Sequence, residues 1–264
     1  MRNLLKLGFV SCLAISTLFT ACSKDDDETK PEDQQPGEKF ISQIIHTNFS
    51  KEKTIYNFDK DGKLISQEEG TTKTTYQYSD DEITVNNGTD KSVYKLDNGR
   101  ITEYVYGNNG SNIKYNYSPD DYLSLVSHTD VKSECVKTRY INILNDNIES
   151  LEVYEEDYKN SYYYQDYYTF EYKTIAPNNL KVDLVMMLAF GGIPMNGYCG
   201  KKYTNLPYKI NYTGEMGKLD PKVKQLEQNP HTIEYEYTYD GDFIVNIEEF
   251  KDGYRNGTYE ITYK

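Results

Sequence analysis

The sequence predicts an all-β protein built as one long antiparallel meander, on three observations. Leu, Ile, Val and Phe are sparse, while Tyr reaches 28 copies and Trp is absent. Tyr suits strands because its ring packs on a pleated surface and its hydroxyl stays in water. Polar and apolar residues alternate along short runs, and Asp, Asn or Gly corners separate these runs about every twenty residues. Because a long meander tends to curl, we expect a barrel-like or superroll sheet.

The repeated unit is a Tyr-x-aromatic strand, a polar turn and a second alternating strand. It occurs at residues 56–65, 76–85, 94–101 and 235–245. The alternation places Thr, Lys, Glu and Asp on one face and Tyr, Ile, Val and Leu on the other. A transmembrane barrel would instead carry an apolar outer band, and the mean hydropathy of −0.79 argues against one. We therefore expect any barrel to be a soluble one.

Residues 180–190 interrupt this pattern with the most apolar run after the N-terminal region. Asn178-Asn179 before it suit a helix cap and Gly191-Gly192 after it suit a helix stop, so we predict a short buried helix inside the curled sheet. A fully buried strand is the alternative. Residues 194–205 and 218–230 are predicted to be long loops, the second with a helical turn at 221–227.

The N-terminus predicts a lipoprotein signal peptide over residues 1–21. Arg2 and Lys6 supply the positive region, and an apolar run too short to span a bilayer follows. The segment 18–22 (Leu-Phe-Thr-Ala-Cys) resembles a bacterial lipobox, which implies that Cys22 becomes the acylated, palmitate-bearing N-terminus and anchors the chain in lipid. An ordinary secretory signal with an unrelated cysteine is the alternative.

The residues after Cys22 predict the cellular location of the protein and a flexible tether. Residues 23–28 (Ser-Lys-Asp-Asp-Asp-Glu) resemble the acidic export signal that sends Bacteroidetes-type lipoproteins through the outer membrane to face the cell exterior. A solvated tether is a compatible reading of the same run. Residues 22–39 are acidic and contain almost nothing apolar, so we expect them to be flexible. Residues 40–264 are then one β-meander domain.

The charge limits the partners of the protein. The chain carries a formal net charge of −13, and removal of Arg2 and Lys6 with the signal peptide lowers it to −15. A chain this acidic is repelled by phosphate backbones and anionic lipid, which argues against nucleic acid as a partner. We expect a monomer that needs no cofactor.

Several segments resemble an uncharacterised family of gut-bacterial surface lipoproteins. They are residues 179–184 (Asn-Leu-Lys-Val-Asp-Leu), Gly197, residues 200–207 (Gly-Lys-Lys-Tyr-Thr-Asn-Leu-Pro) and the closing Tyr-x-Tyr-x-Tyr-Asp hairpin. The resemblance spans roughly residues 40–264. It implies a porin-like antiparallel β fold and a surface location, and it brings no activity or site residues, because the family is a domain of unknown function.

One segment has the spacing of a calcium loop. Asn57, Asp59, Asp61 and Glu68, with Gly62 between them, match the ligand positions of an EF-hand. The first position is Asn rather than Asp and the flanks are strand-like, so a plain hairpin turn is the competing interpretation.

Other residues with chemical potential are few. His46, His128 and His231 lie far apart in the sequence and show no metal-ligand spacing, and we find no catalytic or nucleotide-binding motif. Cys135 and Cys199 are the thiols that remain after processing. They form a disulfide in an oxidising compartment if their backbones lie close enough, and are otherwise free and buried.

A tract of nine aromatic residues between 154 and 172 is the best functional indication. Alternation turns about half of it to the core, and the exposed tyrosines are candidates for stacking on sugar rings: Tyr158, Tyr162, Tyr164 and Tyr168. A cross-strand ladder that only stabilises the sheet is the alternative. The leading hypothesis is a surface-exposed, non-enzymatic binding or interaction module for a glycan or protein. A hydrolase of extracellular glycan and a structural spacer without a ligand are the competing hypotheses.

Overall fold

The computed structural model describes residues 39–88, 90–107, 111–132, 134–177, 182–190, 197–219 and 223–264. Glu38–Lys264 form one compact unit. The predicted signal peptide, Cys22 and all of the predicted tether except Lys39 lie outside the described residues, as do the pairs Asn178-Asn179 and Gly191-Gly192 that were expected to bound the helix.

The described residues form sixteen strands and one helix. In chain order they are β1 (Ile41–Asn48), β2 (Lys53–Phe58), β3 (Leu64–Glu69), β4 (Thr72–Tyr78), β5 (Glu82–Asn87), β6 (Asp90–Asp97), β7 (Arg100–Val105), β8 (Asn112–Tyr117), β9 (Leu123–Asp130), β10 (Cys135–Leu144), β11 (Asn147–Asp157), β12 (Tyr162–Pro177), α1 (Leu184–Phe190), β13 (Asn205–Lys218), β14 (Val223–Asp240), β15 (Phe243–Lys251) and β16 (Tyr254–Tyr263).

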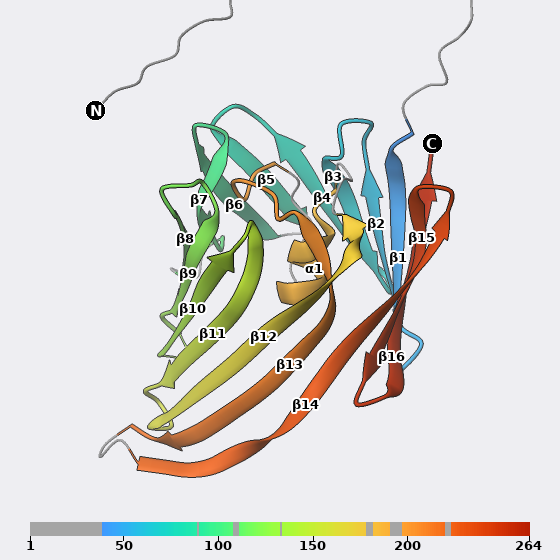
Figure 1. The fold of residues 1–264 in the computed structure, drawn as a ribbon. Coiled ribbons are helices and arrows are strands. Elements are labelled where there is room, and N and C mark those ends of the chain that lie inside the picture. Colours follow the sequence, from blue (N-terminus) through green and yellow to red (C-terminus); the bar gives the residue numbers. More distant parts are fainter. Residues whose placement is uncertain are drawn as a thin grey trace, which may run out of the picture. The chain divides into compact units, whose positions relative to one another are not determined.

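The strands form a closed antiparallel barrel. Each strand pairs with the next along the chain, and β16 returns to pair with β1 (Figure 1). The backbones of Phe40 and Lys264 exchange two hydrogen bonds of 3.0 Å at the junction. The all-β meander predicted from the sequence is confirmed, and of the two predicted forms the sheet adopts the barrel.

Tight turns explain why successive strands pair. Asn98-Gly99, Asn145-Asp146 and Asp252-Gly253 all have positive φ at both central positions, between 50° and 80°. This is the type I′ geometry whose twist matches that of the flanking strands. The Asp/Asn/Gly corners of the sequence therefore act as hairpin turns.

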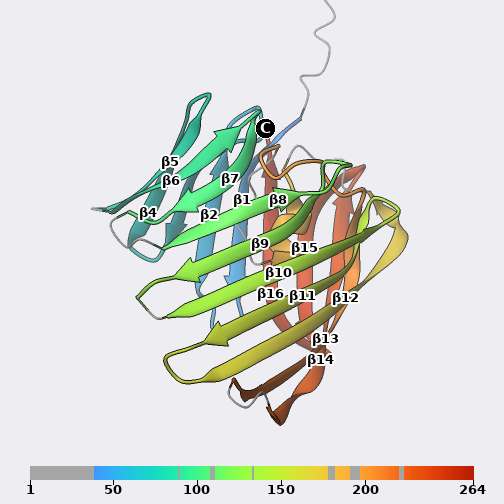
Figure 2. The same cartoon turned by 90° about the vertical axis from the view of Figure 1, so that its left-hand side faces the viewer.

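Successive strands run in opposite directions, so the turns that join them lie alternately at the two ends of the barrel. We call the end that holds Phe40, Lys264 and the turns after even-numbered strands the closed end, and the opposite end the open end. Strands β2–β9 have six to eight residues, whereas β10–β14 have ten to eighteen. The wall is therefore taller on the side of the long strands (Figures 1 and 2).

The outside of the barrel is polar and the inside is apolar. Side chains opposite each other in register share a face, so the buried Ile44, Ile83 and Ile247 mark the inner face of their neighbours. The outer positions carry Thr, Lys, Glu and Asn, and include the exposed ion pairs Lys73–Glu68 and Arg255–Glu248, each 2.6 Å long. A transmembrane barrel has the opposite distribution, with an apolar band outside. The face pattern predicted from the sequence is confirmed.

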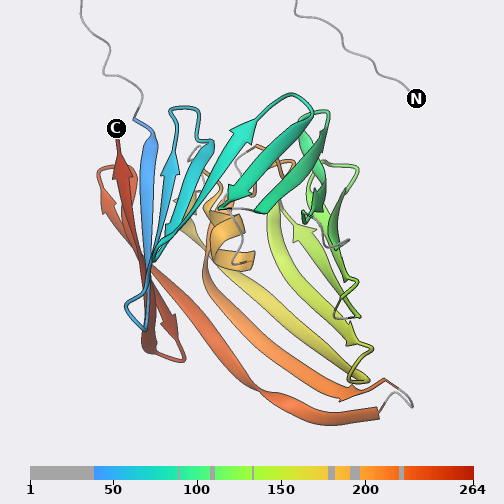
Figure 3. The ribbon, with the colours of Figure 1, turned by 180° about the vertical axis from the view of Figure 1, so that it is seen from behind.

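The short helix α1 lies inside the barrel (Figure 3). Leu184 and Val185 are fully buried, as is Val182 just before them. The Asp183 carboxylate accepts hydrogen bonds from the backbone N–H groups of Val185 (3.1 Å) and Met186 (3.4 Å), as an N-cap does. The predicted buried helix is confirmed, but it begins at Leu184 and Asp183 caps it.

The segment 197–204, which we call the strap, crosses the closed end. Backbone hydrogen bonds join it to three hairpins: Ile101 N–H to Tyr198 C=O (2.8 Å), Lys201 N–H to Asp121 C=O (2.7 Å) and Thr204 N–H to Asp146 C=O (3.0 Å). In the described part of the chain, no helix is long and apolar enough to cross a membrane.

The prediction of a loop over residues 218–230 is wrong. Residues from Val223 onward belong to β14 and pair with β13 as far as Lys218. Pro230 lies at a register shift, because Tyr212 pairs with His231 while Gly214 pairs with Gln228. A proline that lacks an N–H is tolerated at such a bulge, so the long strand continues past it.

Candidate functional site

The inner surface of the long strands at the open end is the best candidate site. It carries charged and aromatic side chains that water reaches. We call it the open-end face, and its main residues are His128 (β9), Lys137 and Arg139 (β10), Glu155 (β11), and Tyr164, Asp166 and Tyr168 (β12).

The strand register fixes how these residues lie. Arg139 stands between Val126 of β9 and Val153 of β11, and both valines are buried in the core, so Arg139 also points inward. The next row toward the open end crosses four neighbouring strands. Its residues pair in register and are His128, Lys137, Glu155 and Tyr164. Four neighbouring strands thus contribute to one surface.

Solvent reaches this surface even though it faces inward. Lys137 Nζ lies 2.8 Å from Glu155 Oε2, and the two side chains keep 31% and 30% of their area exposed. Side chains that share the inner face nearer the closed end, such as Ile141, are buried. The barrel is therefore filled at one end and wetted at the other.

Aromatic rings form two clusters beside the charged row. Tyr106 packs between Tyr104 and His128, with centroid distances of 4.5 and 5.8 Å. Tyr212 packs between Tyr168 and His231, at 5.1 and 4.2 Å. Tyr212 itself is buried, whereas the rings of Tyr106 and Tyr168 are partly exposed. Such rings offer flat apolar surfaces with hydroxyl groups at their edges, which is the chemistry that recognises sugars and other polar rings.

Burial sets the protonation of these rings. It lowers the pKa of His128 and of His231, so both imidazoles are neutral at pH 7. It raises the pKa of Tyr168 to about 12, and Asp166 adds to this, so the hydroxyl keeps its proton. His46, the third histidine, also faces inward and stacks on Tyr259 at 4.4 Å. The three histidines pack against tyrosine rings, and no cluster of metal ligands forms among the described residues.

Three of the four tyrosines predicted as ligand contacts lie on the open-end side of the inner face. These are Tyr162, Tyr164 and Tyr168 of β12, which are separated by even numbers of residues and share the face of Leu151 and Glu155. Tyr168 is partly buried against the core. Tyr158 lies instead in the β11–β12 turn, 52% exposed, and its hydroxyl donates to Glu156.

Sequence reasoning missed the partners of these tyrosines. Tyr106, Tyr212 and Arg139 are twenty-five or more residues from Tyr164 along the chain, and only the pairing of the strands brings them to the same side of the sheet. Alternation within 135–144 would have placed Lys137 and Arg139 on the face of Ile141. This local alternation is the signal in the sequence that marks both side chains as facing inward.

The calcium-loop residues form a hairpin turn. Asp59 Oδ1 accepts hydrogen bonds from the backbone N–H groups of Asp61 and Lys63, both 2.9 Å long. Asn57 Nδ2 donates to Ser66, and Glu68 pairs with Lys73 on the outer surface. These contacts are those of an Asx turn between two strands. They hold Asn57 and Glu68 in separate side-chain contacts rather than around a common centre.

The possible Cys135–Cys199 disulfide is not formed, and both thiols are free. Cys135 begins β10 at the open end, whereas Cys199 lies in the strap at the closed end, where the other end of β10 arrives. Nine steps of about 3.3 Å separate the two ends of that strand, far more than a disulfide spans. Burial raises the pKa of Cys135 to about 11 and that of Cys199 to about 12, so both stay as thiols.

Comparison with solved structures identifies the architecture. A crystal structure described as a porin-like protein from Bacteroides vulgatus ATCC 8482 aligns with a TM-score of 0.64 and 14% sequence identity, covering 86% of this chain and 99% of that one. The fold is porin-like. A comparison with protein families gives no match, and a comparison with curated proteins gives none either. At this identity the similarity concerns the porin-like fold and not the activity.

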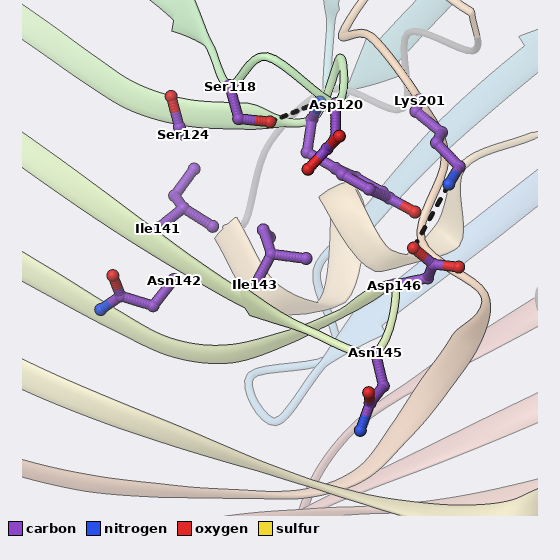
Figure 4. Close-up of a pocket in the computed structure, with 10 residues that line it drawn as sticks. Ser118, Asp120, Ser124, Ile141, Asn142, Ile143, Asn145, Asp146 and Lys201 are labelled. Atoms are coloured by element: carbon purple, nitrogen blue, oxygen red, sulfur yellow. Dashed lines mark hydrogen bonds and ion pairs between the residues drawn. The ribbon is translucent and has the colours of Figure 1, made fainter.

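The porin-like barrel also has a pocket in its wall at the closed end (Figure 4). β9 and β10 pair only as far as Leu125 and Tyr140, and beyond this point they diverge. The gap holds a pocket of about 610 Å³, lined by Ser118, Asp120, Tyr122, Ser124, Ile141, Asn142, Ile143, Asn145, Asp146 and Lys201.

The charges in this wall pocket are largely engaged with each other. Lys201 Nζ lies 3.3 Å from Asp146 Oδ1 and 4.7 Å from the ring centroid of Tyr122. Tyr122 itself is buried, so its ring offers little free surface. The open-end face, with accessible rings and charges, is the stronger candidate.

Proposed function

We propose that the protein is a non-enzymatic binding module, held on the outside of the cell by acylated Cys22, and that the open-end face holds its ligand. The observation that carries this proposal is the wetted inner surface at one end of the barrel, where tyrosine rings from several strands surround charged groups. A ligand that offers a flat ring and several hydroxyls, as an oligosaccharide does, fits this lining.

The carboxyl groups favour binding over hydrolysis. A glycosidase needs an acid whose pKa is raised by desolvation, next to a second carboxylate. The described carboxyl groups whose pKa departs from its ordinary value, Asp146, Asp157 and Glu171, all have it lowered by hydrogen bonds. A spacer without a ligand would also have no use for charged side chains inside a barrel, since their desolvation costs stability.

Binding is tested with the non-acylated mature chain, residues 23–264, on an oligosaccharide array and by calorimetry. Replacing Tyr164 by alanine removes a partly exposed ring of the open-end face and should weaken binding about five- to tenfold, the value of one aromatic contact. Tyr140→Ala is the matched control, because Tyr140 is 46% exposed on the outer surface of β10. Equal losses of affinity in both variants would contradict the proposed site. Turnover of a bound sugar would favour the hydrolase. Absence of binding to every sugar on the array would favour the spacer.

The proposed location on the cell surface is based on the lipobox-like segment and on the acidic run after it. Cys22→Ala should move the protein from the membrane fraction to the soluble fraction, because several buried acyl chains hold a lipoprotein essentially permanently. Cys12→Ala, a change within the predicted signal peptide, should leave the membrane fraction unchanged. Labelling of intact cells with an antibody to the barrel reports exposure. A membrane-bound Cys22→Ala variant, or a wild-type protein that antibody reaches only after lysis, would contradict this location.

The barrel connects to the predicted anchor at the end opposite the proposed site. Phe40, where the chain enters the barrel, pairs with Lys264 at the closed end.

A further inference from the structure

Arg139 is the one arginine of the described chain without a partner. Arg100 pairs with Asp121 and lies over the ring of Tyr117, and Arg255 pairs with Glu248 on the outer surface. Among the described residues, by contrast, no hydrogen bond, ion pair or stacked ring engages the Arg139 guanidinium, although it points into the barrel between two buried valines.

The carboxylates of the neighbouring inner-face positions already have hydrogen-bond or ion-pair partners. Glu155 pairs with Lys137 at 2.8 Å, and Asp166 accepts a hydrogen bond of 2.8 Å from the Tyr212 hydroxyl. Asp130 accepts hydrogen bonds from the Ser111 hydroxyl and the Lys132 backbone, each 3.0 Å long. Glu155 is thus paired with a lysine and Asp166 with a neutral hydroxyl, so Arg139 stands on this face without a carboxylate partner from the residues that the structure describes.

The glycine at position 214 helps to keep this arrangement. It lies in the same row as Asp166, and a Cβ there would approach the Tyr212 hydroxyl to 2.5 Å and Asp166 Oδ1 to 2.7 Å. Since Gly214 leaves that space open, Tyr212 can engage Asp166, and Asp166 is thereby occupied by a neutral donor rather than by Arg139.

Three tyrosine hydroxyl groups lie close enough to the guanidinium of Arg139 to interact with its charge. Burial raises the pKa of the hydroxyl groups of Tyr106, Tyr115 and Tyr168. The positive charge of Arg139 lowers the pKa of each hydroxyl by a smaller amount. These phenols come from the end of β7, from β8 and from β12. A protonated phenol donates a hydrogen bond, and a guanidinium offers a planar pair of N–H donors that matches a carboxylate or sulfate.

We propose that Arg139 binds the carboxylate or sulfate group of an acidic sugar, with the tyrosines of the open-end face contacting the sugar ring. This inference rests on the proposed binding function and names its ligand class. The surrounding −15 charge of the mature chain repels long polyanions. A short acidic oligosaccharide, whose single charged group reaches Arg139, is therefore the ligand that fits.

The test measures binding of four probes to the mature chain by calorimetry. The probes are a neutral galactose trisaccharide, the same trisaccharide with one galacturonic acid residue in place of galactose, the same trisaccharide with one sulfate group, and laurate, which carries a carboxylate without a sugar. The wild-type protein should bind one or both acidic sugars more tightly than the neutral one. Arg139→Gln should lower the affinity for the acidic sugar about 10- to 100-fold, the value of a charge-assisted pair, and leave the neutral sugar unchanged.

Two variants serve as controls. Arg139→Lys keeps the charge and should retain part of the preference, whereas Lys73→Gln removes a paired cation of the outer surface and should leave the preference unchanged. Circular dichroism and thermal unfolding verify that each variant folds, and Arg139→Gln should fold as well as the wild type because Arg139 makes no internal pair.

The outcomes separate this inference from the proposed function. If the neutral and acidic sugars bind equally, or if Arg139→Gln binds both as the wild type does while Tyr164→Ala weakens both, the anion site is wrong and the binding function stands. If laurate binds through Arg139 and the sugars do not, the sugar class is wrong. If none of the probes binds, both the anion site and a glycan ligand are overturned.

Discussion

Replacing Gly200 by alanine is expected to destabilise the barrel by about 3 kcal/mol or more. Gly200 has φ of +79°, a backbone conformation that costs free energy for any residue with a Cβ. A Cβ at this position would also lie 2.3 Å from the Asp121 carbonyl oxygen and 2.9 Å from the Tyr117 ring. Relieving this clash requires the strap to move away from the β8–β9 turn, which breaks the bond from Lys201 N–H to Asp121.

Gly99→Ala is the matched control for this change. Gly99 has nearly the same φ, +75°, but nothing lies within 4 Å of a Cβ built there. The substitution should therefore cost only the backbone strain, about 1 kcal/mol. Urea unfolding followed by circular dichroism gives both values. Equal destabilisation by the two substitutions would mean that close packing of the strap contributes nothing.

Replacing Leu184 by alanine is expected to cost about 2–5 kcal/mol, the range for large-to-small changes in a core. Leu184 is fully buried at the start of α1, inside the barrel. A helix of seven residues is not stable on its own, so α1 exists because the surrounding strands bury it. The truncation leaves a cavity that the closed wall cannot readily collapse to fill.

Leu144→Ala makes the same chemical change on the surface. Leu144 ends β10 with 54% of its area exposed, so the loss should stay within about 0.5 kcal/mol. Thermal and urea unfolding of the two variants provide the comparison. A small effect at Leu184, similar to that at Leu144, would show that α1 does not support the barrel.

The local pattern of the sequence was enough to predict the hairpins. Strand alternation and the corners at Asn98-Gly99 and Asn145-Asp146 depend on residues next to each other, and the structure forms both as tight turns. The apolar run near Leu184 was equally visible, because a short buried helix is marked by its own composition.

Local pattern failed where pairing with a distant strand decided the outcome. Residues 223–230 contain few apolar residues and end at Pro230, which suggested a loop. They form the start of β14 because β13 offers a complete edge of hydrogen-bond partners, and the bulge beside Pro230 removes the need for its N–H. The same limit applies to Cys135 and Cys199, whose separation depends on the length of β10.

The sequence by itself determined which side chains of each strand share a face, and with them the polar exterior. It predicted Tyr164 and Tyr168 among the exposed tyrosines, whereas both lie on the inner face. Only the tertiary structure decided that β16 meets β1, that one end is filled by α1, and that Arg139 stands unpaired among tyrosines from other strands. The physical reason is that facing depends on the two-residue repeat of a strand, which is local. Neighbours across the barrel depend on register and closure, which are set by contacts between residues far apart in the chain.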